Sequence, residues 1–351
     1  MAGSGGVQLD TAATDGETRP SGSRAAAVLR DLDPSVGRGL EIGPLFSPLV
    51  SKETADVRYV DVYLTPVLRA VYEDNHGLPF EDFVDVDCAL EQDGEIRPLA
   101  VATAEYGPFD WVVASHVIEH VPDVIAWLAD VADVLVDDGR LVLAVPDRRY
   151  CFDACRPETT VGEMLRANHD GETRPSIRAI FDHYTSAVSI SAADAWRGHA
   201  QDLRPIHGLD YARAQLRRSL EDGQYVDCHV WLFTPVSFID QMRLLAELDL
   251  LPFVIDSMAA TAVDDMEFHV TLRRLPRQLP AEERKARLAD GFPPVTADAS
   301  VAAVTPSGAP AAGTRLVLLS DREARIVHWK RALADGLRRA LLRARPSGRS
   351  R

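Results

Sequence analysis

Short hydrophobic runs alternate with amphipathic stretches along the first half of the chain. Five of the runs have the length and the β-branched content of strands: Gly39–Gly43, Val57–Tyr63, Asp82–Asp87, Phe109–Val117 and Arg140–Pro146. Most are hydrophobic almost without a break, which is typical of strands that helices cover on both faces. Strands that alternate with helices predict right-handed crossovers and a parallel sheet.

Helical periodicity is clearest before the fifth run and again after residue 233. The predicted helix over Pro122–Val136 carries a hydrophobic stripe, formed by Val124, Trp127, Leu128, Val131 and Leu135. An Asp-Asp-Gly sequence then ends this helix and turns the chain into the fifth strand. A second helix is predicted over Thr234–Leu248, with Thr234 as its cap and Pro235 at its first position.

Two other segments complete the predicted domain. Residues 148–230 are rich in Arg, Asp, His and aromatic residues, and we interpret them as helices and loops inserted after the fifth strand. The runs Pro252–Ile255 and Glu267–Arg273 lie close together with no helix between them. They are therefore predicted to form an antiparallel hairpin.

The two ends of the chain lack the pattern of a folded domain. Residues 1–24 are interpreted as a disordered leader, 25–276 as the domain, starting with a short helix over 25–34, and 277–320 as a Pro/Ala-rich linker. Residues 321–351 are predicted to hold a basic amphipathic helix. Such a helix either packs on its own domain or on a second copy of the chain, or binds an anionic membrane surface or a protein partner.

Composition narrows the class of protein. The chain has 351 residues, of which 46% are hydrophobic and 26% charged, as in an ordinary globular protein. Its formal net charge of −15 argues against nucleic-acid binding, which needs a basic surface. Four cysteines are too few for a disulfide scaffold, no apolar run is long enough to span a membrane, and the first residues do not resemble a secretory signal. A cytoplasmic protein is predicted.

Acidic and polar side chains stand where the predicted strands end. Glu41 and Gly43 close the first strand, Asp61 comes twenty residues after Glu41, and Ser115-His116 close the fourth strand. Ligands of open α/β sheets bind beyond the carboxyl ends of the strands. A glycine there lets the backbone approach the ligand, and a carboxylate with the spacing of Asp61 accepts hydrogen bonds from a ribose diol.

Two further features describe this ligand. Asp87, or its neighbour Asp85, closes the third predicted strand, where an adenine amino group can be recognised. A dinucleotide site needs several glycines around a pyrophosphate, whereas this turn has only Gly43, and Pro44 has no N–H to donate. An adenosine without phosphates therefore fits better than a nicotinamide dinucleotide.

Together these residues resemble a known family. Glu41-Ile42-Gly43, Asp61, Asp87 and the stretches Phe109–Asp123 and Leu135–Asp147 look like the motifs of class I S-adenosylmethionine-dependent methyltransferases, over residues 38–275. The chain is most similar to the small-molecule type often found among bacterial surface-polysaccharide and glycosyltransferase genes. The resemblance implies a Rossmann-like α/β fold with a seven-stranded, mostly parallel sheet in the order 3-2-1-4-5-7-6, whose last strand is antiparallel.

The resemblance also implies S-adenosylmethionine as the cofactor and a set of residues that bind it. The set is Glu41, Gly43, Asp61, Asp87, Ser115 and His116. In it, Glu41 and the backbone of Gly43 face the methionine part of the cofactor. Asp61 holds the ribose hydroxyls, and Asp87 lies by the adenine. Ser115 and His116 line the sulfonium side, and an acidic cleft suits this cation.

A hydroxyl that accepts a methyl group needs a base, and histidine is the natural one near neutral pH. The candidate catalytic residues are His116 and His120 at the mouth of the site and His183 in the insertion, which is predicted to form the lid and acceptor pocket. The candidate substrate-binding residues are Asp147, Arg149, Tyr150 and His229. Each histidine can equally be structural, and the arginine either clamps an anionic acceptor or is a solvated loop charge.

The segment His116–His120 also matches H-x-x-E-H, the inverted zinc-protease signature, which needs both histidines on one face of a helix. Here the first histidine ends a strand and Pro122 follows closely, so no metal site is predicted. The sequence thus predicts an enzyme that methylates a hydroxyl of a small molecule or of a sugar or polysaccharide precursor. Two other functions stay open: a non-catalytic binding module that partners a glycosyltransferase, and an NAD-dependent dehydrogenase on the same sheet.

Overall fold

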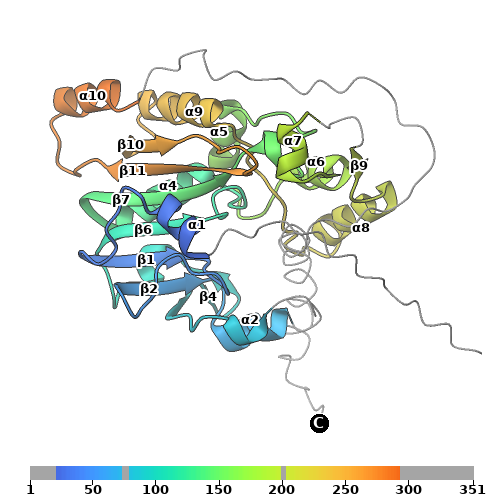
Figure 1. Cartoon of the computed structure of the whole chain (residues 1–351), viewed down its shortest axis with the longest axis horizontal. Helices are drawn as coiled ribbons and strands as arrows, with labels where there is room; N and C mark the ends of the chain where they lie inside the picture. Colours follow the sequence, from blue (N-terminus) through green and yellow to red (C-terminus); the bar gives the residue numbers. More distant parts are fainter. Residues whose placement is uncertain (1–20, 73–78, 199–202, 293–351) are drawn as a thin grey trace, which may run out of the picture.

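The computed structural model describes residues 21–72, 79–198 and 203–292, and its centre is a seven-stranded sheet (Figure 1). The strand order is β10-β11-β7-β6-β1-β2-β3. The strands are β1 Arg38–Ile42, β2 Asp56–Asp61, β3 Cys88–Ala89, β6 Phe109–Ser115, β7 Leu135–Pro146, β10 Phe253–Ala259 and β11 Glu267–Arg274. Only β11 runs antiparallel to its neighbours in this sheet. Counted along the chain, the order is 3-2-1-4-5-7-6, so the predicted Rossmann-like fold is confirmed.

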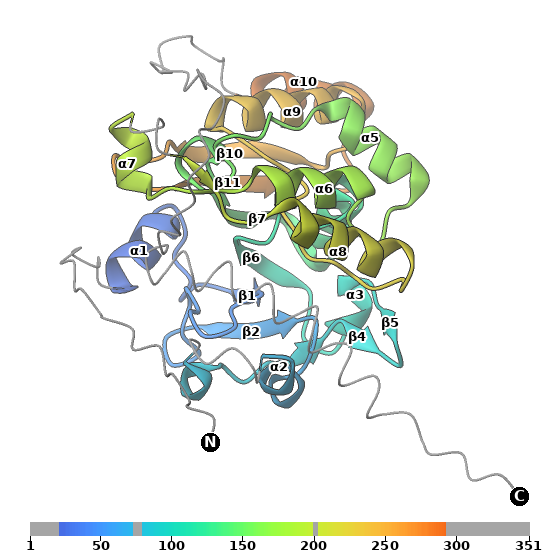
Figure 2. The same cartoon turned by 90° about the vertical axis from the view of Figure 1, so that its right-hand side faces the viewer.

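Helices flank the sheet and also build the segment after β7 (Figure 2). They are α1 Ser21–Val28, α2 Thr65–Val71, α3 Leu99–Ala102, α4 Val124–Val134, α5 Val161–Asp170, α6 Ile177–Ser186, α7 Ala192–Trp196, α8 Leu209–Leu220, α9 Pro235–Glu247 and α10 Ala281–Asp290. Figure 2 shows α6 and α8 side by side. The short strands are β4 Glu91–Gln92, β5 Glu95–Ile96, β8 Val188–Ser189 and β9 Arg204–Pro205. The predicted insertion, 148–230, therefore holds α5 to α8 and the pair β8–β9.

Local capping explains where the main helices begin. The Thr234 hydroxyl accepts a hydrogen bond from the Ser237 amide at the start of α9, and Pro235 occupies the first turn, as predicted. The Asp123 carboxylate accepts a hydrogen bond from the Ala126 amide at 3.0 Å and so starts α4. These caps supply acceptors to amides that a helix leaves unpaired at its N-terminus.

The central strands bury both faces, because successive residues point to opposite sides of the sheet. Leu40, Val112 and Leu141 belong to the larger hydrophobic cluster, whereas Trp111 and its cluster lie on the other face. This packing requires glycine at position 39, because a Cβ there would overlap the Trp111 indole.

The prediction of a third strand over Asp82–Asp87 is wrong. The segment starts with a 3-10 helix, Phe80–Asp82, and the strand is only Cys88–Ala89. Its backbone groups are taken by a side chain of α2: the Thr65 hydroxyl donates to the Val84 carbonyl and accepts from the Val86 amide. A strand cannot extend where these groups are already bonded.

The domain boundaries differ from the predicted ones at both ends. Helix α1 starts at Ser21, inside the predicted leader, and α10 lies inside the predicted linker 277–320. Phe292, just after α10, is buried, which fixes this helix to the domain. The predicted leader up to residue 20 and the predicted C-terminal helix 321–351 lie outside the described residues. None of the described helices is long and apolar enough to cross a membrane.

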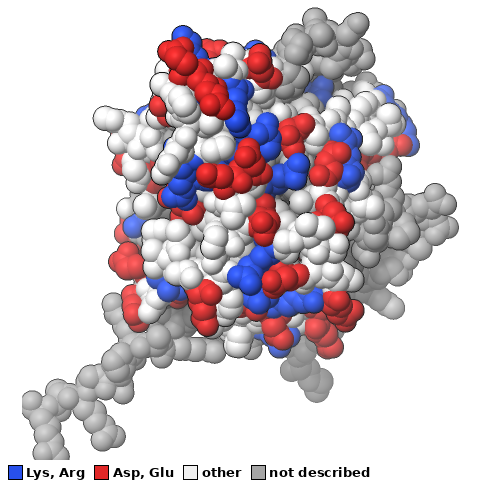
Figure 3. All heavy atoms as spheres, turned by 90° about the vertical axis from the view of Figure 1, so that its left-hand side faces the viewer, with Lys and Arg blue, Asp and Glu red and all other residues white. Residues whose placement is uncertain are grey.

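Charged side chains of both signs are interspersed on the face shown in Figure 3. Ion pairs also join strands of the sheet: Arg273 contacts both Asp138 at 3.0 Å and Asp256 at 3.2 Å. Exposed pairs of this kind each contribute little to stability, roughly 0–1 kcal/mol. This face of the molecule therefore has no single-sign patch that would attract a charged partner.

Candidate functional site

The carboxyl ends of β1, β2 and β6 meet at one edge of the sheet. Ile42 pairs with Val60 on one side and with Ala114 on the other. The next residues along the three strands are Gly43, Asp61 and Ser115, so the register places them side by side. The sheet therefore brings the main predicted ligand-facing residues to the edge where open α/β sheets bind ligands.

Gly43 makes the turn at this edge. Its φ of +67° lies in the left-handed region that favours glycine, and its amide donates to the Val60 carbonyl at 2.8 Å. A Cβ here would come within 3.3 Å of Val117 Cγ2. The glycine is therefore required both by the backbone conformation and by the closeness of the segment after β6.

Glu41 holds the loop after Gly43. Its side chain is only 2% exposed, and its two oxygens accept hydrogen bonds from the amides of Leu49 at 2.7 Å and Val50 at 3.0 Å. Burial raises the pKa of Glu41 to about 7 in spite of these bonds. Glu41 thus shapes the binding edge through its own backbone loop.

Asp61 ends β2 with a carboxylate that has no ion-pair partner among the described residues. Its Oδ1 accepts a hydrogen bond from the Val62 amide at 2.6 Å. Burial raises the pKa of Asp61 to about 7. A carboxylate that has lost water without gaining a cation is stabilised by any hydroxyl donors that a ligand brings.

Asp87 lies beside β2, although not at the end of a strand. Its Oδ2 accepts a hydrogen bond from the Tyr59 amide at 2.7 Å and pairs with Lys52 Nζ at 2.7 Å. The carboxylate therefore ties the segment before β3 to β2. Its predicted contact with an adenine stays a prediction.

Ser115 contacts a residue that sequence reasoning missed. Arg24, from α1, donates from Nη2 to the Ser115 hydroxyl at 2.7 Å and forms two bonds of 2.8 Å with the Glu267 carboxylate. Both charged groups are largely buried, with side chains 16% and 4% exposed. Helix α1 is thus anchored at the binding edge by a bidentate ion pair. The one signal in the sequence was Glu267, a charged residue at the start of the hydrophobic strand β11, which indicates that a buried partner is needed.

His116 and Glu119 follow β6 directly. His116 has a φ of +55°, and its Nε2 lies 2.7 Å from Glu267 Oε2. Glu119 is 0% exposed, and neither of its oxygens has a hydrogen-bond partner among the described residues. The ring nitrogens nearest to Glu119 Oε1 are His116 Nδ1 at 3.5 Å, His120 Nε2 at 3.6 Å and His229 Nε2 at 3.9 Å.

A second layer of acids holds these histidines. His120 Nδ1 lies 2.9 Å from Asp227 Oδ1, and His229 Nδ1 lies 2.5 Å from Asp153 Oδ2. The Arg156 guanidinium, 3% exposed, bonds Asp153 at 2.7 Å. Asp153, Arg156 and Asp227 were missed because nothing in the sequence marks these loop residues as partners of the distant histidines.

The pKa values of the cluster follow from burial and from these neighbours. Burial alone would lower the pKa of His116, but the nearby Glu119 and Glu267 raise it to about 8. His120 behaves alike: burial lowers its pKa, and Asp227 outweighs this and raises it. Burial alone would raise the pKa of Glu119, but the histidines bring it below its ordinary value.

His183, a predicted base, is placed behind His229. Its Nδ1 accepts a hydrogen bond from the His229 amide at 3.3 Å, and Arg156 Nη1 is 3.5 Å away. Burial, assisted by the positive charge of Arg156, lowers the pKa of His183 well below its ordinary value. A neutral ring whose acceptor nitrogen already serves a backbone amide is structural, so His183 is not placed to act as the base.

The predicted substrate residues after β7 mostly bond to one another. Asp147 is 0% exposed and accepts hydrogen bonds from Arg149 Nη2 at 2.6 Å and the Thr261 hydroxyl at 2.7 Å. Tyr150 stacks on Trp196 with ring centroids 4.0 Å apart. Asp147 and Arg149 therefore stabilise the segment that leaves the sheet. The guanidinium of Arg149, which was predicted to bind an anionic acceptor, is already paired with Asp147.

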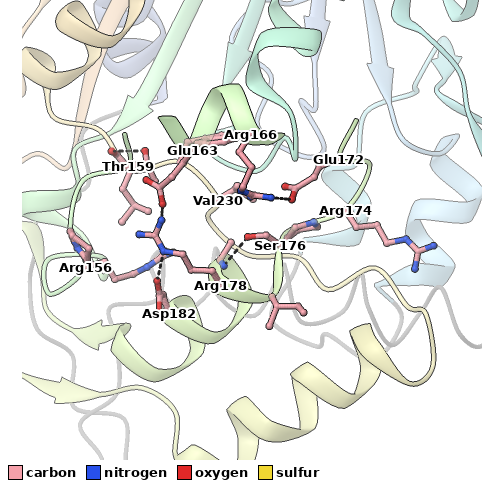
Figure 4. Close-up of a pocket in the computed structure, with 16 residues that line it drawn as sticks. Arg156, Thr159, Glu163, Arg166, Glu172, Arg174, Ser176, Arg178, Asp182 and Val230 are labelled. Carbon is pink, nitrogen blue, oxygen red and sulfur yellow. Dashed lines mark hydrogen bonds and ion pairs between the residues drawn. The ribbon is translucent and has the colours of Figure 1, made fainter. Parts of the chain in front are cut away.

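The insertion contains a cavity of about 480 Å³, away from the strand ends (Figure 4). It lies between α5 and α6 and is lined by charged side chains of both signs, which include Arg156, Glu163, Arg166, Glu172, Arg174, Arg178 and Asp182. Figure 4 shows Arg178 between Glu163 and Asp182, to both of which it is bonded. Ile177, Val230, Trp231 and Leu232 also line the cavity, so that much of its wall is apolar, and it shares Arg156 with the histidine cluster.

Comparisons with known proteins give one matching family model and several similar solved structures. A family model described as a methyltransferase domain matches residues 21–243. No curated protein matches the chain. Similar solved structures include an S-adenosylmethionine-dependent methyltransferase from Methanosarcina mazei, with 14% identity over 71% of this chain and 98% of that one, and a TM-score of 0.34.

Two further solved structures are similar to the chain at the same level. One is an S-adenosylmethionine-dependent methyltransferase from Mesorhizobium loti, with 16% identity over 71% of this chain and 98% of that one, and a TM-score of 0.35. The other is the 1,6-didemethyltoxoflavin-N1-methyltransferase of Burkholderia thailandensis with bound S-adenosylhomocysteine, with 13% identity over 73% and 78%, and a TM-score of 0.34. These similarities are too low to bear on the substrate.

Proposed function

The chain belongs to the methyltransferase-domain family, whose methyl donor is S-adenosylmethionine, and we propose that it methylates a hydroxyl oxygen of a small molecule or sugar. The observation that carries the proposal is the strand-end edge, where Gly43, Asp61 and Ser115 lie side by side. This edge adjoins the cluster of His116, Glu119 and His120. A site for an adenosine and a site for handling a proton are thus neighbours.

The residues present fit the cofactor. Asp61 has a half-buried carboxylate that pairs with no cation among the described residues, and a ribose diol would supply two hydroxyl donors to it. Gly43 leaves the backbone open at the turn. When bound, the cofactor supplies an electrophilic methyl group, so the protein has to align the acceptor and accept its proton.

An oxygen acceptor is proposed because the neighbouring cluster can take up a proton. A hydroxyl must lose its proton during methyl transfer, and His116 and His120 each have one ring nitrogen oriented by a carboxylate, that of Glu267 and that of Asp227 respectively. Because the pKa of His116 is about 8, its ring accepts this proton only in the neutral form, which dominates above that pH. A carboxylate that orients an imidazole also stabilises its protonated form. The acceptor itself would enter through the insertion.

Calorimetry followed by a transfer assay tests this function. The purified protein is expected to bind S-adenosylmethionine and S-adenosylhomocysteine and not NAD, because Gly43-Pro44 offers no cradle for a pyrophosphate. It is then supplied with methyl-labelled donor and matched pairs of sugars and amino sugars, and the methylated atom is identified by NMR. Methyl on nitrogen in the amino sugar only would refute the oxygen acceptor. Binding of NAD alone would refute the methyltransferase.

Gly43→Ala is expected to lower the free energy of unfolding by about 1–2 kcal/mol, the cost of a Cβ in the left-handed region. It should also weaken cofactor binding, because the turn must move away from Val117. Gly171→Ala is the matched control. Gly171 has a φ of +62° at the end of α5 with no atom near its missing Cβ. Both variants should lose stability in denaturant titration. Equal cofactor affinity in the two would contradict the placement of Gly43.

A further inference from the structure

The cluster after β6 has a feature that a proton-handling role does not explain. Glu119 is completely buried. Its two oxygens have no hydrogen-bond partner in the part of the chain that the structure describes, and Oε1 faces ring nitrogens of three histidines at 3.5–3.9 Å. A buried carboxylate without hydrogen bonds costs several kcal/mol, so native proteins pair such groups or bind metals with them. The distances to the rings are at or beyond the limit for a hydrogen bond.

We propose that Glu119, His120 and His229 bind a divalent first-row transition-metal ion such as Zn²⁺. One ligand atom from each of these side chains lies within 4.8 Å of those of the other two. Two ligands bound tetrahedrally to zinc at about 2.05 Å stand about 3.4 Å apart. The Glu119 oxygen is 3.6 Å from the His120 nitrogen and 3.9 Å from that of His229, and no two of the three ligand atoms are more than 4.8 Å apart, so shifts of at most about 1.4 Å complete the geometry.

The second layer is arranged as around a metal. Histidine ligands in proteins nearly always donate their other ring N–H to a carboxylate or carbonyl, which fixes the ring and its tautomer. Here His120 Nδ1 contacts Asp227 and His229 Nδ1 contacts Asp153. In both rings the remaining nitrogen, Nε2, is the atom turned toward Glu119. A single histidine–carboxylate pair is common in proteins. Two such pairs whose free-facing nitrogens point at the same buried carboxylate are the arrangement expected of a metal site.

Charge balance is compatible with a divalent ion when the imidazoles are neutral. The buried carboxylates around the centre belong to Glu119, Asp153, Asp227 and Glu267, and the buried guanidiniums belong to Arg24 and Arg156. With neutral imidazoles, two of these four carboxylates have no balancing positive charge, and a divalent cation would supply it. Ring protons on the histidines are the competing way to remove this deficit. Imidazole ligands favour a transition metal over Mg²⁺ or Ca²⁺, which prefer oxygen.

The proposed metal site differs from the H-x-x-E-H signature, which requires two histidines on one helix. Glu119 and His120 come from the turn before α4, and His229 comes from the end of the insertion, 109 positions later in the sequence. Three protein ligands leave one position open, as in catalytic zinc sites. The acceptor hydroxyl would fill that position. His120, whose two ring nitrogens are then taken by the ion and by Asp227, no longer serves as a base, which leaves that role to His116. These last assignments rest on the proposed function, whereas binding of the ion does not.

Metal binding by the wild-type protein is the first test. The protein is treated with a chelator, dialysed against Zn²⁺ and desalted, and zinc is counted by mass spectrometry in the absence of methyl donor and acceptor. About one ion per chain is expected. X-ray absorption of the loaded protein should show nitrogen and oxygen ligands at about 2.0–2.1 Å. Absence of stoichiometric zinc, or a shell at the zinc–sulfur distance of about 2.3 Å, which would point to the cysteines, overturns the proposal.

Variants then locate the ion. Glu119→Gln, which keeps the volume of the side chain, and His229→Ala should abolish stoichiometric binding. Asp227→Asn should weaken the affinity for Zn²⁺ by about 10–100-fold, the usual effect of losing an outer-shell carboxylate. His169→Ala and Asp182→Asn change surface residues outside the centre and should bind zinc normally. Zinc bound equally well by Glu119→Gln and by wild type refutes the site, whatever the activity.

Discussion

Asp61→Ala is expected to lower the affinity for S-adenosylhomocysteine by about 100-fold or more. The Asp61 carboxylate is half-buried at the end of β2, with one backbone hydrogen bond and no ion pair to residues 21–72, 79–198 or 203–292. Two ribose hydroxyls would each donate to it, and hydrogen bonds to charged groups contribute roughly 1.5–3 kcal/mol each. Isothermal titration calorimetry at pH 8 measures the change.

The matched variant Asp61→Asn separates ligand binding from stability. Burial raises the pKa of Asp61 from its ordinary 3.8 to about 7, so the folded protein holds this proton more tightly than the unfolded chain. The stabilisation by the proton is complete below pH 4 and is lost as the pH rises through 7. At pH 8 Asp61→Asn should therefore unfold with a free energy up to about 4 kcal/mol higher than wild type, and at pH 3.5 the difference should vanish.

Cofactor affinity should depend on the same titration of Asp61. Here the ionised form is the favourable one, whereas the protonated form favours folding. Only the ionised carboxylate accepts both ribose bonds, so the affinity of wild type is expected to rise about tenfold between pH 6 and pH 8. The affinity of Asp61→Asn should be weak and flat over this range. A wild-type affinity independent of pH, or an Asn variant that binds as tightly as wild type, would place the ribose elsewhere.

The sheet and its binding edge follow from local sequence. Hydrophobic runs predict the strands, and parallel strands with crossovers share one carboxyl edge, so Gly43, Asp61 and Ser115 had to become neighbours. The helix cap at Thr234 is equally local. These features need no knowledge of which distant residues meet. They were predicted for that reason.

The partners of the site residues are the part that the sequence could not predict. Glu41 bonds to its own loop, and His183 serves a backbone amide in the insertion. The Arg24–Glu267 pair joins residues 243 positions apart. Such contacts depend on how a variable insertion and a terminal helix pack on the sheet, which no pattern within one segment encodes. For the same reason the sequence could not predict that His229 lies next to Glu119.

Arg24→Ala is expected to lower the free energy of unfolding by about 3 kcal/mol, since it leaves the 4%-exposed Glu267 without its guanidinium. The Glu267 carboxylate keeps His116 and His269, which places the loss at the low end of the range for a broken buried pair. Helix α1 should also detach from the strand-end edge. Denaturant titration measures the stability, and protease susceptibility measures the detachment.

Two comparisons make this test specific. Arg30→Ala removes an exposed arginine that follows α1, whose pair with Asp31 is 46% and 42% exposed, and should cost at most about 1 kcal/mol. Arg24→Lys keeps the charge but replaces the two-pronged contact by a single point, so it should recover only part of the loss. Equal stability of Arg24→Ala and Arg30→Ala would mean that α1 does not rest on this ion pair.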